Sequence, residues 1–198
     1  MIKTKKKSIE QLYSYLFDAS RTINQLRKAK KNKLISMQFI ERIMLAVTEV
    51  NGCEICSYGH TKIALEQGMS EEEIQMLLSG ETSGVPTDQL HAVMFAQHYA
   101  DTEGKPSEAA WEKLVQEYGL ERSYGILGAT RMIMFGNTYL VPVGNIKDRL
   151  TGKKNLDSSI INDLIKTISI IVLLPTAVIH TLFTKEPLIS FNHVAQVQ

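Results

Sequence analysis

Residues 41–60 read ERIMLAVTEVNGCEICSYGH, from Glu41 to His60. Within this stretch the run 43–47 is apolar at every position, so we expect a helix over 36–50 that is buried on most sides. The pair Asn51-Gly52 then favours a break in the chain. A further helix is expected over 53–67, and it begins with the first of two cysteines.

Helical signals also dominate outside this stretch. Apolar periodicity, capping residues and stop glycines predict helices over 8–29, 70–80, 92–100, 110–118 and 123–139. Ser70 to Glu73 is predicted to form a capping box, and the basic run 27–33 to form a solvated loop. Gly125, Gly128 and Gly136 cost helix propensity but would let helices approach closely. The β-branched run 168–172 does not alternate, so no strand is expected and the predicted fold class is all-α.

The composition is that of an ordinary globular protein. The chain has 198 residues, of which 44% are hydrophobic and 22% charged, and its formal net charge is +1. This length suits one domain or a domain with an extension. No global basic field is available to hold phosphates, so a dedicated nucleic-acid binder is not expected.

The two ends of the chain carry different signals. Met1 to Lys7 is basic, but no apolar run follows it, so we expect no export signal and a cytoplasmic location. From Thr167 to Thr184 no residue is formally charged, and Lys166 and Lys185 flank this run. We expect 167–184 to form a core helix or an oligomer interface, and a membrane-touching tail is the second interpretation.

The candidate chemistry lies in Cys53, Cys56 and His60. On a helix these residues are one turn apart and share a face. A free thiol has a pKa of about 8.5, and both a helix N-terminus and a nearby imidazole favour the reactive thiolate. The two thiols are also close enough to form a disulfide. Glu41, on the buried preceding helix, needs a partner, and His60 is the natural candidate; Glu49 ranks second.

Other interpretations of these residues stay open at this point. Cys53, Cys56 and His60 supply three plausible zinc ligands, although no second Cys/His pair stands at a standard spacing elsewhere. Buried cysteines also serve as small apolar groups. His91 and His98 lie seven residues apart and are expected to be partly buried helix residues rather than ligands. Spacing alone favours redox chemistry over metal binding and over a structural role.

The motif of a glutamate, eleven residues and Cys-x-x-Cys-x-x-x-His resembles the carboxymuconolactone decarboxylase-like superfamily, in its alkylhydroperoxidase AhpD-like branch. Glu41, Cys53, Cys56 and His60 match all four positions of that motif. The resemblance extends more weakly to about Gly152. It divides the chain into an N-terminal helix and basic loop over 1–35, an AhpD-like core over 36–152 and a C-terminal helical extension over 153–198.

This resemblance implies an all-α helical bundle with the CxxC at the start of a core helix, assembled as a homo-oligomer, a trimer or a hexamer. It implies a thiol-dependent peroxidase or disulfide reductase. Cys56 would attack the peroxide, His60 and Glu41 would relay protons, and Cys53 would resolve the sulfenic acid as a disulfide. An external dithiol or a thiol protein would restore the thiols, and no metal, flavin or haem is implied.

Two alternative functions belong to other classes. The branch that decarboxylates the lactone generally lacks the two cysteines, so their presence argues against a lactone decarboxylase. A non-catalytic assembly module stabilised by zinc would use Cys53, Cys56 and His60 as ligands instead.

Overall fold

The computed structural model describes residues 7–153 and 158–191. These residues form eight helices and no strand, which confirms the all-α prediction. The helices are α1 (Ile9–Lys31), α2 (Met37–Asn51), α3 (Glu54–Glu66), α4 (Glu71–Leu78), α5 (Thr87–Asp101), α6 (Glu108–Tyr118), α7 (Leu120–Leu150) and α8 (Ile160–Phe183).

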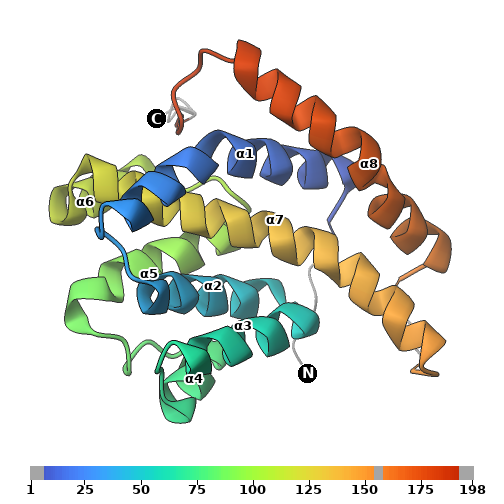
Figure 1. Ribbon diagram of the computed structural model, residues 1–198, viewed down its shortest axis with the longest axis horizontal. Coiled ribbons are helices and arrows are strands. Elements are labelled where there is room, and N and C mark those ends of the chain that lie inside the picture. Colours follow the sequence, from blue (N-terminus) through green and yellow to red (C-terminus); the bar gives the residue numbers. More distant parts are fainter. Residues whose placement is uncertain (1–6, 154–157, 192–198) are drawn as a thin grey trace, which may run out of the picture.

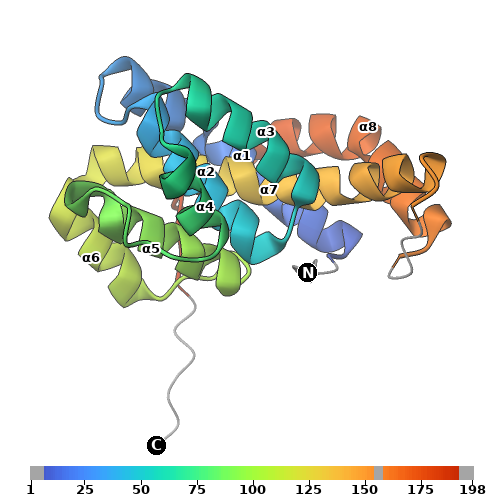
Figure 2. The same ribbon diagram turned by 90° about the horizontal axis from the view of Figure 1, so that it is seen from below.

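Helix α7 is the central element of the bundle. It packs against α1, α2, α3, α5, α6 and α8. Figure 1 shows α1 and α8 on one side of α7 and α2, α3 and α4 on the other. Figure 2, at right angles to the first view, shows α3 and α4 in front of α7 and α1 behind it. The main apolar core therefore lies around α7, with a smaller cluster between α2, α4 and α5.

The first helix, α1, includes most of the residues that were predicted to form a basic loop. Ser8 caps α1 with a full capping box, and the helix continues to Lys31, so Lys28, Lys30 and Lys31 lie in its last turn. The loop prediction for 27–33 was therefore wrong over most of its length. Cations are favourable at the C-terminal end of a helix because they face the negative end of its dipole.

The predicted capping box at Ser70 is only half formed. The Ser70 hydroxyl accepts the backbone N–H of Glu73, but the Glu73 carboxylate binds Arg42 of α2 instead of returning to the cap. The Arg42–Glu73 pair is largely buried, and both carboxylate oxygens accept from the guanidinium. This paired contact holds α4 against α2.

Helix α7 is longer than predicted, because it continues past Tyr139 and through Pro142 to Leu150. Two of its four glycines allow a close approach of α1. A Cβ at Gly125 would lie 2.4 Å from the Cβ of Ala29, and one at Gly128 would lie 3.0 Å from the carbonyl oxygen of Thr22. Gly136 differs, because the nearest neighbour of its Cβ would be 3.9 Å away.

The C-terminal helix α8 is not part of the core. Only 6% of its most apolar 18-residue window is buried, so the core interpretation of 167–184 was wrong. Among the described residues, α8 is the one helix whose length and apolar composition would allow it to cross a membrane. It lies along α1 and α7 at an outer edge of the molecule (Figure 1).

Buried Arg131 of α7 contacts α1, α5 and the segment after α8. Its guanidinium donates to the Tyr99 hydroxyl and to the carbonyl of Leu188, and it lies 3.6 Å from Asp18. Burial raises the pKa of Tyr99 to about 12, against the opposing effect of Arg131. Burial likewise raises the pKa of Asp18. The segment after α8 is thus fastened to the centre of the bundle.

The predicted domain boundaries at 35/36 and 152/153 stay predictions. Helix α1 packs along α7 as part of the same bundle. The basic residues 1–6, on which the export prediction rests, lie outside the described residues.

The glycine contacts yield a matched stability test. Gly125→Ala should lower the free energy of unfolding by about 1–2 kcal/mol, because the overlap with Ala29 costs more than the gain in helix propensity. Gly136→Ala, with open space around its Cβ, should raise it by up to about 1 kcal/mol. Urea denaturation of both variants measures the two changes. Shifts of the same sign would contradict the close-approach interpretation of Gly125.

Candidate redox site

The turn between α2 and α3 positions the two cysteines. Gly52 adopts a left-handed conformation with φ 68°, which closes α2 through a hydrogen bond from its N–H to the Thr48 carbonyl. Cys53 follows in an extended conformation as the N-cap of α3. Cys56 is then in the first turn of the helix, where unpaired backbone N–H groups favour negative charge on a nearby sulfur.

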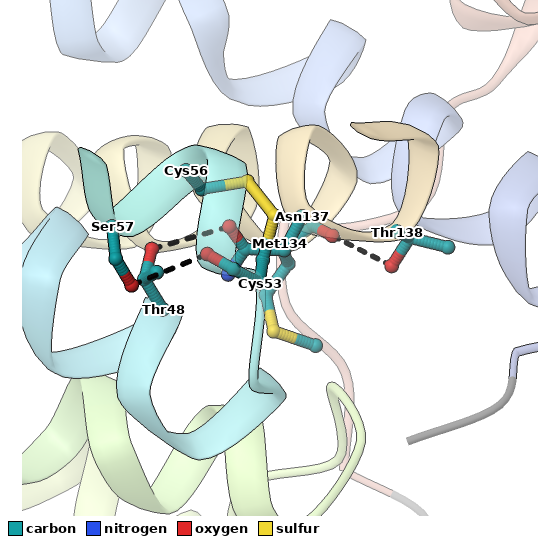
Figure 3. Close-up of a disulfide and its surroundings, with 7 residues drawn as sticks. All are labelled: Thr48, Cys53, Cys56, Ser57, Met134, Asn137 and Thr138. Atoms are coloured by element: carbon teal, nitrogen blue, oxygen red, sulfur yellow. Dashed lines mark hydrogen bonds between the residues drawn. A yellow bond between two sulfur atoms is a disulfide. The ribbon is translucent and has the colours of Figure 1, made fainter. Parts of the chain in front are cut away.

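Cys53 and Cys56 form a disulfide, drawn in Figure 3. Both residues are buried, with exposed fractions of 1% and 3%. The hydroxyl of Ser57 donates to the carbonyl of Cys53, which keeps the N-terminal end of α3 close to the turn. The predicted ability of the two sulfurs to pair is therefore present in the fold.

Glu41 and His60 meet across the α2–α3 pair. His60 Nδ1 lies 2.8 Å from Glu41 Oε2, and the side chains of Glu41 and His60 are 3% and 22% exposed. With the carboxylate ionised, Nδ1 carries the proton and donates it, so Nε2 is the ring nitrogen left for other contacts. The structure thus brings together Glu41 and His60, with His60 one turn beyond Cys56 on α3.

The other sequence candidates lie elsewhere. The carboxylate of Glu49 lies close to Gly80, at the end of α4, rather than at His60. His91 pairs with Glu117 of α6, and the His98 ring accepts the backbone N–H of Ser107. His91 and His98 are partly buried helix residues that bind protein groups.

A metal site is not formed by the part of the chain that the structure describes. No group of three His, Cys, Asp or Glu residues there is arranged to hold an ion. Cys53 and Cys56 use their sulfurs in the disulfide, and His60 uses Nδ1 on Glu41. The three ligands proposed for zinc are therefore engaged with protein groups.

Sequence reasoning missed the polar residues beside the disulfide. Figure 3 shows Met134 and Asn137 of α7 next to the two cysteines. The hydroxyl of buried Thr48 donates to Asn137 Oδ1 at 3.1 Å, and Asn51 Nδ2 contacts the sulfur of Met134 at 3.2 Å. These positions come from two helices far apart in sequence, and only the Gly136-Asn137 pair carried a weak signal.

Two amide atoms of this group lack a hydrogen-bond partner among the described residues. They are Asn51 Oδ1 and Asn137 Nδ2, and both side chains are buried. Buried amide groups are nearly always hydrogen-bonded, so such atoms call for an explanation. Here they are one acceptor and one donor, on α2 and α7.

A pocket of about 260 Å³ opens beside the α2–α3 turn. Its walls combine the turn with the C-terminal half of α7 and include Gly52, Cys53, Tyr58, Val141 and Lys147. The lining residues that the structure describes include Cys53 but neither Cys56 nor His60. This pocket therefore borders the disulfide at Cys53.

Residues 18–98 match the sequence profile of the carboxymuconolactone decarboxylase family. This segment of the chain is similar to the family. The matched segment contains Glu41, Cys53, Cys56 and His60, so all four motif residues lie within the family region. No curated protein and no solved structure gives a match.

The buried Glu41–His60 contact predicts a stability difference independent of any activity. His60→Ala should lower the free energy of unfolding by about 2–3 kcal/mol, because it leaves the Glu41 carboxylate buried without its partner. Adding Glu41→Gln to that variant should recover at least about 1 kcal/mol, since an amide carries no charge. Urea denaturation of the disulfide-bonded proteins measures both values.

The control for this test is His91→Ala, which removes a histidine from a more exposed pair with Glu117. Its expected cost is below about 1 kcal/mol. An equal cost for His60→Ala and His91→Ala would mean that the Glu41–His60 bond contributes no more than a surface contact.

Proposed function

We propose that this protein is a thiol-dependent peroxidase or disulfide reductase whose redox pair is Cys53 and Cys56. The observation that carries the proposal is the disulfide at the N-terminus of α3, one turn before a histidine bound to a buried glutamate. The four-residue match to the AhpD-like motif supports the same choice over lactone decarboxylation, since that reaction needs no thiol pair.

In the reduced protein, the Cys56 thiolate attacks one oxygen of a hydroperoxide. The O–O bond breaks, the sulfur is oxidised to a sulfenic acid, and the other oxygen leaves as an alcohol or water after it gains a proton. Cys56 suits this role because it lies in the first turn of α3 and one turn before His60.

His60 and Glu41 form the proposed proton relay. His60 Nδ1 is held by Glu41, so Nε2 exchanges the proton with the Cys56 thiol and then with the leaving oxygen. Glu41 fixes the ring orientation and stabilises the imidazolium that forms when the thiol is deprotonated. Because the Glu41 side chain is buried, water does not compete with His60 for this carboxylate.

The cycle closes through Cys53. Its thiolate attacks the sulfenic acid of Cys56, which forms the disulfide and releases water. An external dithiol, or a thiol protein, then attacks the disulfide, and two of its thiols are oxidised as Cys53 and Cys56 are reduced. The pocket beside Cys53 supplies the space through which a slender thiol approaches.

Single cysteine substitutions test the assignment of the two sulfurs. Cys56→Ser should abolish turnover of an organic hydroperoxide with a dithiol reductant. Without the dithiol, Cys53→Ser should consume one equivalent of peroxide and then stop, with a mass gain of one oxygen atom on Cys56. Ser57→Ala, the adjacent position on α3, is the matched control and should keep most of the activity. Turnover by Cys56→Ser at the parent rate would show that Cys56 is not the attacking sulfur.

Substitution of the relay tests the proton path. In the Cys53→Ser background, His60→Gln should slow peroxide reduction by about 10²–10⁴-fold, which is the usual contribution of a general acid–base group. The rise of the Cys56 alkylation rate with pH should also move to higher pH in this variant, because the imidazole no longer stabilises the thiolate. Glu41→Gln should shift the alkylation profile in the same direction. Unchanged alkylation profiles in both variants would remove the relay from the mechanism.

A further inference from the structure

The apolar residues of α8 face outward. On a helix with 3.6 residues per turn, the exposed apolar positions other than Leu174 fall within an arc of about half the circumference. This arc runs the full length of α8 and contains no polar or charged side chain. We call it the outer face of α8, and it consists of Ile160, Ile161, Leu164, Ile165, Ile168, Ile171, Val172, Pro175, Val178, Ile179, Leu182 and Phe183.

Two polar residues of α8 contact the bundle. Buried Asp163 accepts hydrogen bonds from Arg149 at 2.6 Å and from Asn145 at 3.3 Å. Further along, His180 stacks on Phe17 with 4.4 Å between ring centroids, and its Nδ1 lies 2.9 Å from the Tyr13 hydroxyl. An ordinary surface helix turns its apolar side to the core, whereas most large apolar residues of α8 are exposed.

Contacts at both ends hold α8 in this orientation. Arg149 and Asn145 fix its first turn to the end of α7. After its last turn, Arg21 donates to the carbonyls of Glu186 and Pro187, and Arg131 donates to that of Leu188 at 2.8 Å. The outer face is therefore a fixed flank of the molecule and not a loosely attached tail.

The chemistry of the outer face indicates its partner. Protein interfaces carry about one hydrogen bond per 100–200 Å² and are enriched in Tyr, Trp, Met and Arg. The outer face offers no hydrogen-bonding side chain, and its members are aliphatic except for Pro175 and Phe183. A hydrocarbon layer requires no hydrogen bonds, and a helix embedded to its axis in such a layer buries half of its circumference.

The charged residues in and next to α8 lie outside its outer face. Lys166 and Lys185 flank the uncharged run 167–184, Asp163 is paired with Arg149, and Glu186 follows Lys185. Lys166 lies on the polar side of the helix, and Lys185 follows its end, where headgroups would meet a helix lying in the plane of the interface. We propose that the outer face of α8 binds a lipid surface, with the helix lying parallel to it.

A membrane-spanning arrangement does not fit these contacts. At 1.5 Å per residue, the helix of 24 residues is about 36 Å long, which is enough to cross a bilayer. To do so, α8 would have to carry Asp163, Lys166 and His180 into hydrocarbon and lose their contacts with the bundle. In-plane binding keeps every one of those contacts.

Vesicle flotation of the full chain tests the proposal. The protein should float with phosphatidylcholine vesicles that contain one third phosphatidylglycerol. The double variant Ile171→Asp plus Ile179→Asp places two charges on exposed positions of the outer face. It should bind these vesicles at least about tenfold more weakly, because each carboxylate would have to enter the acyl region. Circular dichroism confirms that both proteins have the same helix content.

The matched control is Leu120→Asp, because Leu120 is an exposed apolar residue on α7, outside the outer face. It should float like the parent. Failure of the parent to float would overturn the proposal. So would a soluble oligomer, measured by light scattering, that the double variant dissociates, since a second copy of the chain would then cover the outer face. Neither readout involves the thiols, so the result is independent of the proposed peroxidase activity.

Discussion

The hydrogen bond between Glu41 and His60 is the constraint around which the site is organised. A buried carboxylate is costly unless a partner compensates for its lost hydration, and here that partner is His60, one turn beyond Cys56 on α3. To bring the two together, the chain must reverse direction within a few residues after α2, and the left-handed turn at Gly52 does so. The same turn leaves Cys53 as the N-cap of α3, so the Glu41–His60 contact and the disulfide arise from one local fold.

Helix α7 connects this site to the rest of the molecule. Its small residues admit α1, Met134 and Asn137 lie against the disulfide, and its last turns form a wall of the pocket. Asn145 lines that pocket and also donates to Asp163 at the start of α8. The docking of α8 and the shape of the pocket therefore depend on the same stretch of α7.

Local signals in the sequence predicted most of the helices and the pairing of Glu41 with His60. The spacing from Cys56 to His60 is one helical turn, and a glutamate on a buried helix needs a partner, so both inferences followed from short-range geometry. Asn137 and Thr48 could not be found in this way, because their contact joins α7 to α2 across 89 residues. The run from Lys28 to Lys31 was wrongly assigned to a loop. A basic loop and the cation-rich last turn of a helix have similar sequences, and here the cations belong to the helix.

The error at α8 has a different physical origin. Hydropathy measures how apolar a segment is, and it correctly marked 167–184, but it does not say which side of a helix meets the protein. The orientation of α8 is set by two contacts with the bundle. Asp163 pairs with Arg149 and Asn145, and His180 stacks on Phe17. Once these polar groups bind the bundle, the geometry of the helix obliges the residues of the outer face to point away from it.

The segment 18–98 that matches the family profile contains Glu41, Cys53, Cys56 and His60, whereas the pocket wall on α7 and all of α8 lie beyond it. The disulfide and the surface that α8 presents thus come from separate parts of the chain, and α7 is the element that contacts both parts.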